Sequence, residues 1–193
     1  MLRILLSSVL LALIVLPWIP CSNGVGSEAG VIELQPTEDV HIMHMSEVYK
    51  LSVYDLEYLR VCKKLGGVEE EELGSVHPYR LYVSFLKFDV SGIPADAKVS
   101  SAELKIYVYE LEEPYEVGVH RCLDTSWSEK DTEWAILPPV ETQPTSTVLV
   151  DKTGWHSLDA KAALMEALPA GELALAIQIE DYYPTRGLWF WSR

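Results

Sequence analysis

The sequence has 193 residues, which is the size of one domain with a core that needs no disulfide or metal to hold it together. Hydrophobic residues make up 49% of the chain and charged residues 23%, a composition that excludes a wholly disordered protein. Acidic residues number 29 against 15 basic ones, and because the resulting net charge of −14 repels polyanions, we expect no nucleic-acid partner.

The N-terminal segment has the pattern of a targeting sequence. One basic residue precedes an uncharged, mostly apolar run at 4–16, which is shorter than the roughly 20 residues that a membrane-spanning helix needs. We predict that residues 1–21 are a signal peptide and that 22–30 form a flexible lead to a single domain at 31–193. Retention as an N-terminal anchor and lipidation at Cys21 are the alternatives. The predicted localisation is secreted or cell surface.

Most of the chain after the lead alternates with period two, which predicts strands. The clearest strand is 99–109, in which Leu104 and Ile106 share an apolar face while Tyr107 and Tyr109 share the polar one. Further strands are predicted, in chain order, at 39–42, 79–90, 116–120, 147–150, 173–179 and 187–192.

One helix interrupts these strands. Asp159 can cap it, the residues that follow have helical spacing, and the Pro-Ala-Gly segment at 169–171 ends it. Many strands, one short helix and frequent turns predict an all-β protein, an antiparallel β-sandwich of the jelly-roll kind. We expect Leu86 and Phe88 to meet the apolar face of 99–109 between its sheets.

Two cysteines lie in the predicted domain. Cys62 and Cys122 either form a disulfide, which by closing a long loop would stabilise the fold by about 4 kcal/mol, or are buried free thiols. Their spacing in the sequence does not decide between these alternatives, because it does not determine their distance in space.

Several stretches resemble the DNRLRE domain, a β-sandwich module of exported proteins that is also grouped with carbohydrate-binding modules. In 81–107, a strand ends in Leu-x-Phe-Asp at 86–89, a Pro-containing turn follows, and the next strand opens with Ser-Ala-x-Leu at 101–104. The stretch 127–138 resembles the family's Trp-x-Glu, Trp and Pro segment. Shorter likenesses lie at 34–39, 155–159 and 190–193.

The resemblance implies an exported, non-catalytic β-sandwich that binds polysaccharide or serves at the cell envelope. Members of the family continue into a final strand that has no counterpart after Arg193. Either a sheet edge is therefore open to a partner chain, or residues 46–62 supply the strand.

Outward-facing aromatic rings are the predicted ligand-binding residues. Tyr107 and Tyr109 lie on the polar face of their strand, and Trp189 and Trp191 alternate with apolar neighbours on the last strand. Aromatic rings offer rigid apolar faces on which the C–H faces of sugars can stack. Arg186 completes the predicted site, because a guanidinium can pair with the carboxylate of a uronic acid.

Other residues of these stretches have different expected roles. Lys105 and Lys87 flank the predicted site and are expected to pair with uronate carboxylates in the same way as Arg186. The remaining tryptophans of the matched stretches are expected in the core or bracing loops: Trp127, Trp134 and Trp155.

Acidic residues allow two further hypotheses. Asp39, Asp89 and Glu129 are the predicted ligands of a structural calcium ion, or else they cap turns; no cofactor is required. Glu129 with Asp131 or Glu133 offers the carboxylate pair of a glycoside hydrolase, so a polysaccharide-degrading enzyme or its accessory module is an alternative function. A structural or adhesive surface subunit that pairs through an open sheet edge is the other alternative.

Overall fold

The computed structural model describes residues 9–16, 30–44, 50–53, 58–69, 76–130, 137–180 and 187–191. Strands dominate these residues, so the prediction of an all-β sandwich with one short helix is confirmed. The elements are β1 (Val9–Leu16), β2 (Gly30–Leu34), β3 (Glu38–His44), β4 (Lys50–Val53), β5 (Tyr58–Glu69), β6 (Val76–Asp89), β7 (Lys98–Leu111), β8 (Tyr115–Arg121), β9 (Ser146–Val150), β10 (Gly154–Asp159), α1 (Lys161–Ala167), the 3-10 turn Leu168–Ala170, β11 (Glu172–Ile179) and β12 (Gly187–Trp191).

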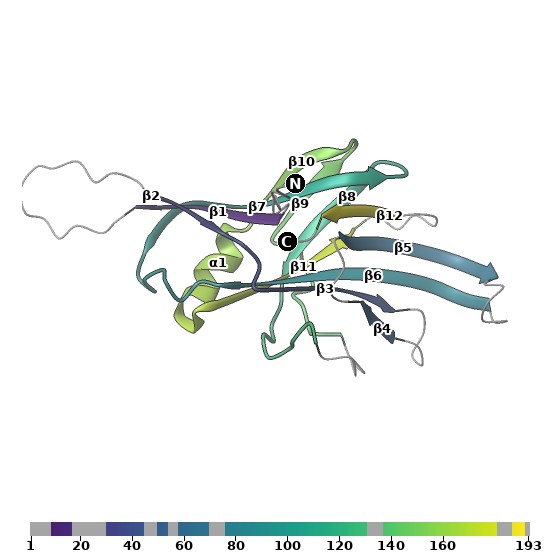
Figure 1. Ribbon diagram of the computed structural model, residues 1–193, viewed down its shortest axis with the longest axis horizontal. Coiled ribbons are helices and arrows are strands. Elements are labelled where there is room, and N and C mark those ends of the chain that lie inside the picture. Colours follow the sequence, from purple (N-terminus) through teal and green to yellow (C-terminus); the bar gives the residue numbers. More distant parts are fainter. Residues whose placement is uncertain are drawn as a thin grey trace, which may run out of the picture.

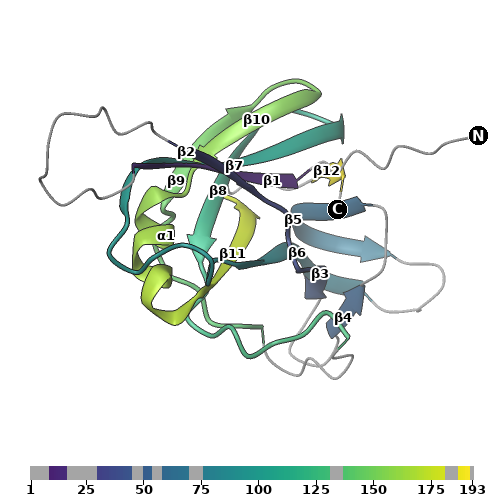
Figure 2. The same ribbon diagram turned by 60° about the vertical axis from the view of Figure 1, so that its left-hand side comes forward.

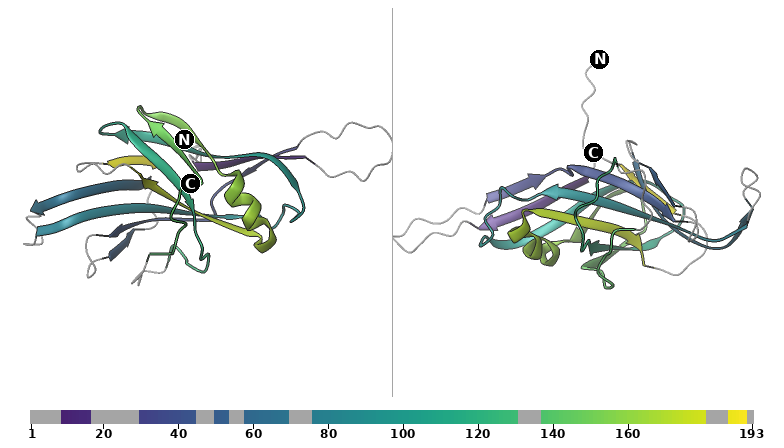
Figure 3. Two further views of the ribbon diagram at one scale, coloured as in Figure 1. Left: turned by 180° about the vertical axis from the view of Figure 1, so that it is seen from behind. Right: turned by 90° about the horizontal axis from the view of Figure 1, so that it is seen from below.

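The strands form one hydrogen-bonded path that folds over into two layers. Its order is β2-β1-β7-β12-β5-β6-β11-β8-β9, while β10 pairs with β7 and β3 pairs with both β6 and β4. All of the strand pairs described are antiparallel. The long strands β5 and β6 run side by side to one end of the molecule, and α1 lies at the other end (Figure 1). The views from behind and from below show the same arrangement (Figure 3).

The main core lies between the two layers. Leu86 and Phe88 of β6 pack there with Leu104 and Ile106 of β7, and all four side chains are fully buried, as the alternation predicted. Helix α1 packs against β7 and β11 and closes one end of this core (Figure 2). The outward face of β7 is left uncovered by this packing, which determines where a binding surface can form.

A second core covers the opposite face of β6. Val83 and Phe85 pack there with Val40 and Ile42 of β3 and with Trp127, which lies in the long connection after β8. Strand β6 is therefore buried on both faces from Tyr82 to Phe88, and this explains why its sequence is a nearly continuous apolar run.

Cys122 belongs to the second core and is a free, buried thiol. The disulfide alternative is therefore not found at Cys122; Cys62 lies in β5, and its side chain is outside the described part of that strand. Burial raises the pKa of the Cys122 thiol from its ordinary value to about 12, so it stays protonated and unreactive at neutral pH.

Three of the strands that alternation did not predict change the layout of the sheet. Strand β1 lies within the predicted signal peptide, yet it pairs with β2 and β7; cleavage, which stays a prediction, would remove it from the sheet. Strand β5 overlaps the stretch 46–62 and inserts between β12 and β6. Strand β10 occupies the residues that were expected only to lead into the helix.

Candidate functional site

Four aromatic side chains gather on the outward face of β7 and its neighbours, and we call them the aromatic ledge: Tyr107, Tyr109, Trp155 and Trp191. Tyr107 stands opposite Trp155 of β10, and their ring centroids are 5.4 Å apart in an edge-to-face arrangement. The rings of Tyr109 and Trp191 of β12 lie 4.6 Å apart with planes tilted by 30°. Trp155 keeps 53% of its surface exposed, whereas the other three are half-buried.

A register irregularity between β7 and β12 brings the second pair together. Trp189 stands opposite Glu110, whereas the next residue, Phe190, stands opposite Val108, so Tyr109 is the extra residue on β7. Val108 is buried and Glu110 is exposed, and Leu111 packs on the core again. This bulge places two consecutive residues of β7 outward, and one of them is the ring that meets Trp191.

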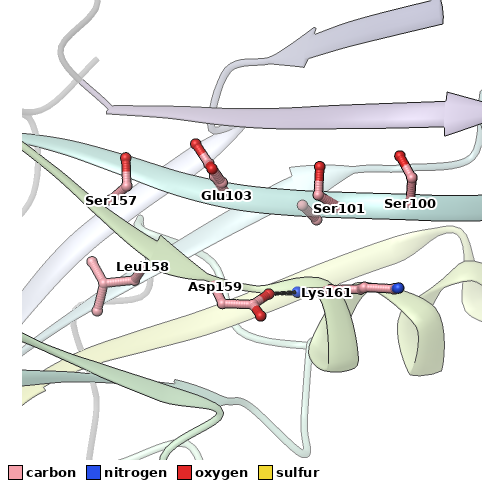
Figure 4. Close-up of a pocket in the computed structure, with 8 residues that line it drawn as sticks. Ser100, Ser101, Glu103, Ser157, Leu158, Asp159 and Lys161 are labelled. Carbon is pink, nitrogen blue, oxygen red and sulfur yellow. Dashed lines mark hydrogen bonds between the residues drawn. The ribbon is translucent and has the colours of Figure 1, made fainter. Parts of the chain in front are cut away.

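A hollow of about 380 Å³, with polar and apolar lining, lies further along β7 and β10. From the ledge, the register runs from the pair Tyr107–Trp155 through Lys105–Ser157 to Glu103–Asp159. Figure 4 shows the side chains of Ser157, Glu103, Ser101 and Ser100 pointing to one side of β7, with Asp159 and Lys161 below them. Rings and hydroxyl groups therefore follow one another along the same pair of strands.

Both acidic side chains that line the hollow, Glu103 and Asp159, have a partner within the protein. Lys105 Nζ lies 3.9 Å from Glu103 Oε2, with both side chains at least one-third exposed. The Asp159 carboxylate accepts a hydrogen bond of 2.8 Å from the backbone N–H of Lys161, drawn dashed in Figure 4. Asp159 lies one residue before the N-cap, Ala160, which has no side-chain cap hydrogen bond, so the predicted N-cap is displaced by one residue.

The predicted ligand-binding residues are partly brought together. Tyr107, Tyr109 and Trp191 share the ledge, and Trp189 is half-buried on the same strand as Trp191. Arg186 lies outside the described residues. Whether these side chains bind a sugar stays a prediction.

Trp155 was missed as a site residue, because the sequence predicted it inside the core or bracing a loop. It is instead the most exposed ring of the ledge. The sequence carries only a short signal, the polar Ser157 and Asp159 on either side of Leu158. In β10 the exposed Trp155, Ser157 and Asp159 alternate with the buried His156 and Leu158. Trp127 was predicted correctly and is buried in the second core, whereas Trp134 lies outside the described residues.

Lys87 is not available to a ligand, so its predicted role beside the site is wrong. It is only 5% exposed. Its ammonium lies 3.2 Å from Glu38 Oε1 and 3.6 Å from Glu172 Oε1, donates to the backbone carbonyl of Trp127, and sits 4.5 Å from the centre of that indole ring. The register of β3 on β6, which places Glu38 opposite Lys87, turns this cation inward.

Glu38 is held charged by this arrangement. Burial opposes its charged form, but hydrogen bonds from the Glu129 N–H and the Ser128 side chain, together with Lys87, hold the pKa of Glu38 below its ordinary value of 4.5. These contacts join strand β3, strand β6 and the connection after β8, and their role is structural.

The three predicted calcium ligands do not gather at one point. The buried Asp39 donates its backbone N–H to Glu129 Oε2 at 3.2 Å, which brings these two residues together. Asp89 is exposed, and its carboxylate accepts the N–H of Ser91 at 2.9 Å, so it caps a turn. Within the described stretches no three His, Cys, Asp or Glu side chains converge to hold a metal ion. Calcium binding stays a prediction that this geometry does not support.

Comparison with known families gives one match. The sequence model of Carbohydrate-binding module family 96 matches residues 74–183, which is more than half of the chain. The matched range includes β6 to β11, and with them Tyr107, Tyr109, Trp155 and the hollow. Comparison with curated proteins finds no match. Among the described residues, no helix has the length and apolar character that crossing a bilayer requires.

Proposed function

Because the chain belongs to Carbohydrate-binding module family 96, we propose that it binds polysaccharide through the aromatic ledge, as a non-catalytic module that is secreted or held at the cell surface. The observation that carries the proposal is the row of rings on the outward face: Tyr107 against Trp155, and Tyr109 against Trp191. Aromatic rings combine apolar area with a rigid geometry, which suits stacking on the C–H faces of sugars.

The shape of the surface supports a polymer as the ligand. From Tyr109 to Ser101 the strand advances eight residues, or about 27 Å at the usual rise of a strand. Rings lie at one end of this distance and hydroxyl groups at the other. A surface of that length can hold several sugar rings of one chain at once, whereas a single sugar would contact only part of it.

We propose a binding role alone, because Glu129, the described member of the suggested carboxylate pair, is engaged in hydrogen bonds within the fold. Glu129, the proposed acid of the enzyme alternative, accepts the Asp39 N–H through its carboxylate and supports Glu38 through its own N–H. Its suggested partners, Asp131 and Glu133, lie outside the described residues.

Affinity electrophoresis tests the proposal. We expect retardation of the protein by at least one member of a panel of neutral and acidic polysaccharides. Trp155→Ala should weaken that binding by about two- to tenfold, because one ring contact contributes about 0.5–1.5 kcal/mol and 1.4 kcal/mol is a factor of ten in Kd. The unfolding temperature should not change, since Trp155 is exposed.

Leu123→Ala is the matched control, because Leu123 is also exposed, at 55%, but follows β8 beside the second core, away from the ledge. It should bind as the wild type does. No retardation on any polymer, or equal losses from Trp155→Ala and Leu123→Ala, would refute binding at the ledge.

A further inference from the structure

We propose that the edge of β7 at residues 98–106 is a docking site for a strand of another protein chain. The site opens when the predicted signal peptide is removed, because β1 lies within that peptide and occupies this edge in the full chain. The partner is a strand that runs antiparallel to β7 and has apolar residues at every second position. This inference rests on the predicted cleavage and is independent of the proposed function.

Strand β1 lies on the edge of β7 that faces away from β10. Both β1 and β10 pair with β7 over residues 103–106, so they must lie on opposite sides of it. Val108 likewise pairs with Gly154 of β10 and with Phe190 of β12, which places β12 on the same edge as β1. Because β1 and β12 both run antiparallel to β7, β1 continues the line of β12 along this edge.

Removal of β1 would leave backbone groups of β7 without partners beside the main core. Ala102, Leu104 and Ile106 are buried in that core. Within the described part of the chain, β1 is the strand that pairs with this edge over residues 98–106. Strand β2 does not replace it in its observed direction, because β2 is antiparallel to β1 and therefore runs parallel to β7. A row of unpaired N–H and C=O groups is a template for an added strand.

The two faces of β7 define the sequence pattern of the partner. In the register of β1, Leu11 stands opposite the buried Leu104, whereas Leu10 stands opposite Lys105 on the outward face. Positions on the first face require apolar residues, and positions on the second suit polar ones, such as an acid opposite Lys105. Strand β1 is apolar throughout, as the central run of a signal peptide must be. A strand with alternating apolar and polar residues therefore fits this edge better than β1 itself.

A full-length chain with a specific protease site placed within residues 22–29 tests the proposal. Before cleavage, β1 is tethered to its own edge at an effective concentration of about millimolar, so a labelled peptide at about micromolar concentration cannot displace it. After cleavage the segment at 9–16 is free to exchange with the peptide. We expect the peptide to bind the cleaved chain and not the intact one. Equal binding to both would overturn the proposal.

The peptide has the sequence of residues 9–16 with polar residues at three positions that stand opposite the outward face of β7. Glutamate then lies opposite Lys105 and lysine opposite Glu103, which also makes the peptide soluble. The three substitutions are Leu10→Glu, Ala12→Lys and Ile14→Thr.

Two variants of the peptide test the register. Leu11→Asp places a charge opposite the buried Leu104, so it should weaken binding at least about tenfold. The matched control has Ile14→Asp in place of Ile14→Thr, which adds the same charge opposite Ser101 on the outward face. It should bind within about twofold of the parent peptide, since exposed substitutions change little. Equal losses from the two variants would overturn the proposed docking.

Hydrogen exchange locates the bound peptide on the chain. Amides of residues 98–106 that face β1 should be protected in the intact chain, lose protection when the segment at 9–16 is released, and regain it with the peptide. Lasting protection in a cleaved chain that binds no peptide would mean that the chain closes its own edge, and would overturn the proposal. If cleavage unfolds the chain, refolding on addition of the peptide supports the proposal, and failure to refold overturns it.

The oligomeric state of the cleaved chain identifies the source of the strand. We expect a monomer in the absence of the peptide and a complex of one chain with one peptide in its presence, measured by analytical ultracentrifugation. Dimers that the peptide dissociates would assign the edge to a second copy of this chain and overturn its assignment to a different protein.

Discussion

Lys87 and Lys105 show how far the role of one residue type depends on its surroundings. Both were expected to face a ligand. Lys105 lies on the outward face of β7 and forms an exposed pair with Glu103, whereas Lys87 lies on β6, which has a core on each face. Because a buried ammonium must be paired, Lys87 collects two carboxylates, a carbonyl and an indole ring.

Replacing each lysine by methionine, which keeps the apolar stem, should separate these two environments. Lys87→Met leaves the partly buried Glu38 without its cation, so we expect a loss of about 2–3 kcal/mol in the free energy of unfolding. Lys105→Met should cost at most about 1 kcal/mol, because exposed pairs contribute little. Urea denaturation measures both, and equal losses would contradict the structural role of Lys87.

At the scale of elements, the helical segment ends where the Pro-Ala-Gly segment at 169–171 predicts that it ends. The turn Leu168–Ala170 follows α1, and Gly171 ends it in the left-handed conformation with φ of 74°. The Gly171 N–H donates to the carbonyls of Ala167 and Leu168 at 3.1 and 3.2 Å. Strand β11 begins at the next residue, so this glycine sets the direction in which the chain enters the core.

Gly171→Ala should destabilise the protein by about 1 kcal/mol, because a side chain is strained at this φ and its Cβ would lie 3.3 Å from Ser91 Cβ. Gly92→Ala is the control in a nearby turn, since that glycine does not have a positive φ and a Cβ there meets nothing within 4 Å. Thermal unfolding distinguishes them. A Gly92→Ala loss as large as that of Gly171→Ala would contradict the conformational explanation.

In the whole molecule, the positions of the two cores determine which faces of the strands remain accessible. One core joins the two layers and the second lies beneath the connection after β8, so both faces of β6 are buried. The outward face of β7 carries neither core. The ledge and the hollow form on this remaining face, where β7, β10, β12 and the start of α1 meet.

Acid should weaken the contacts of Glu38 that join β3 to Lys87 of β6 and to the connection after β8. Since the folded-state pKa of Glu38 lies below its ordinary value of 4.5, its contribution to stability is present above pH 4.5 and is lost as the pH falls through the folded-state pKa. Glu38→Gln should therefore reduce the slope of unfolding free energy against pH below about pH 4.5. Urea denaturation between pH 3 and 7 measures that slope. Identical slopes for the wild type and Glu38→Gln would contradict a stabilising role for the ionised Glu38.

Short-range pattern predicted much of the fold. Alternation placed β3, β6 to β9, β11 and β12 close to their observed positions, and the helix was predicted from its spacing and its cap. Strand β10 was missed, because its six residues were taken for the approach to the helix. Strand β5 was missed as well, although one of its partners, β6, is the next strand in the chain. Two glycines at 66–67 interrupt its alternation, at the point where its register on β6 shifts.

The sequence by itself determined the strand-rich character, the residues of the main core and the aromatic residues of β7, because alternation and side-chain type are local properties. Only the tertiary structure decided that Trp155 stands opposite Tyr107, that Trp191 meets Tyr109 and that Lys87 is buried. The physical reason is register: a shift by one residue turns every side chain of a strand to its other face, and register depends on partners that are distant in the chain.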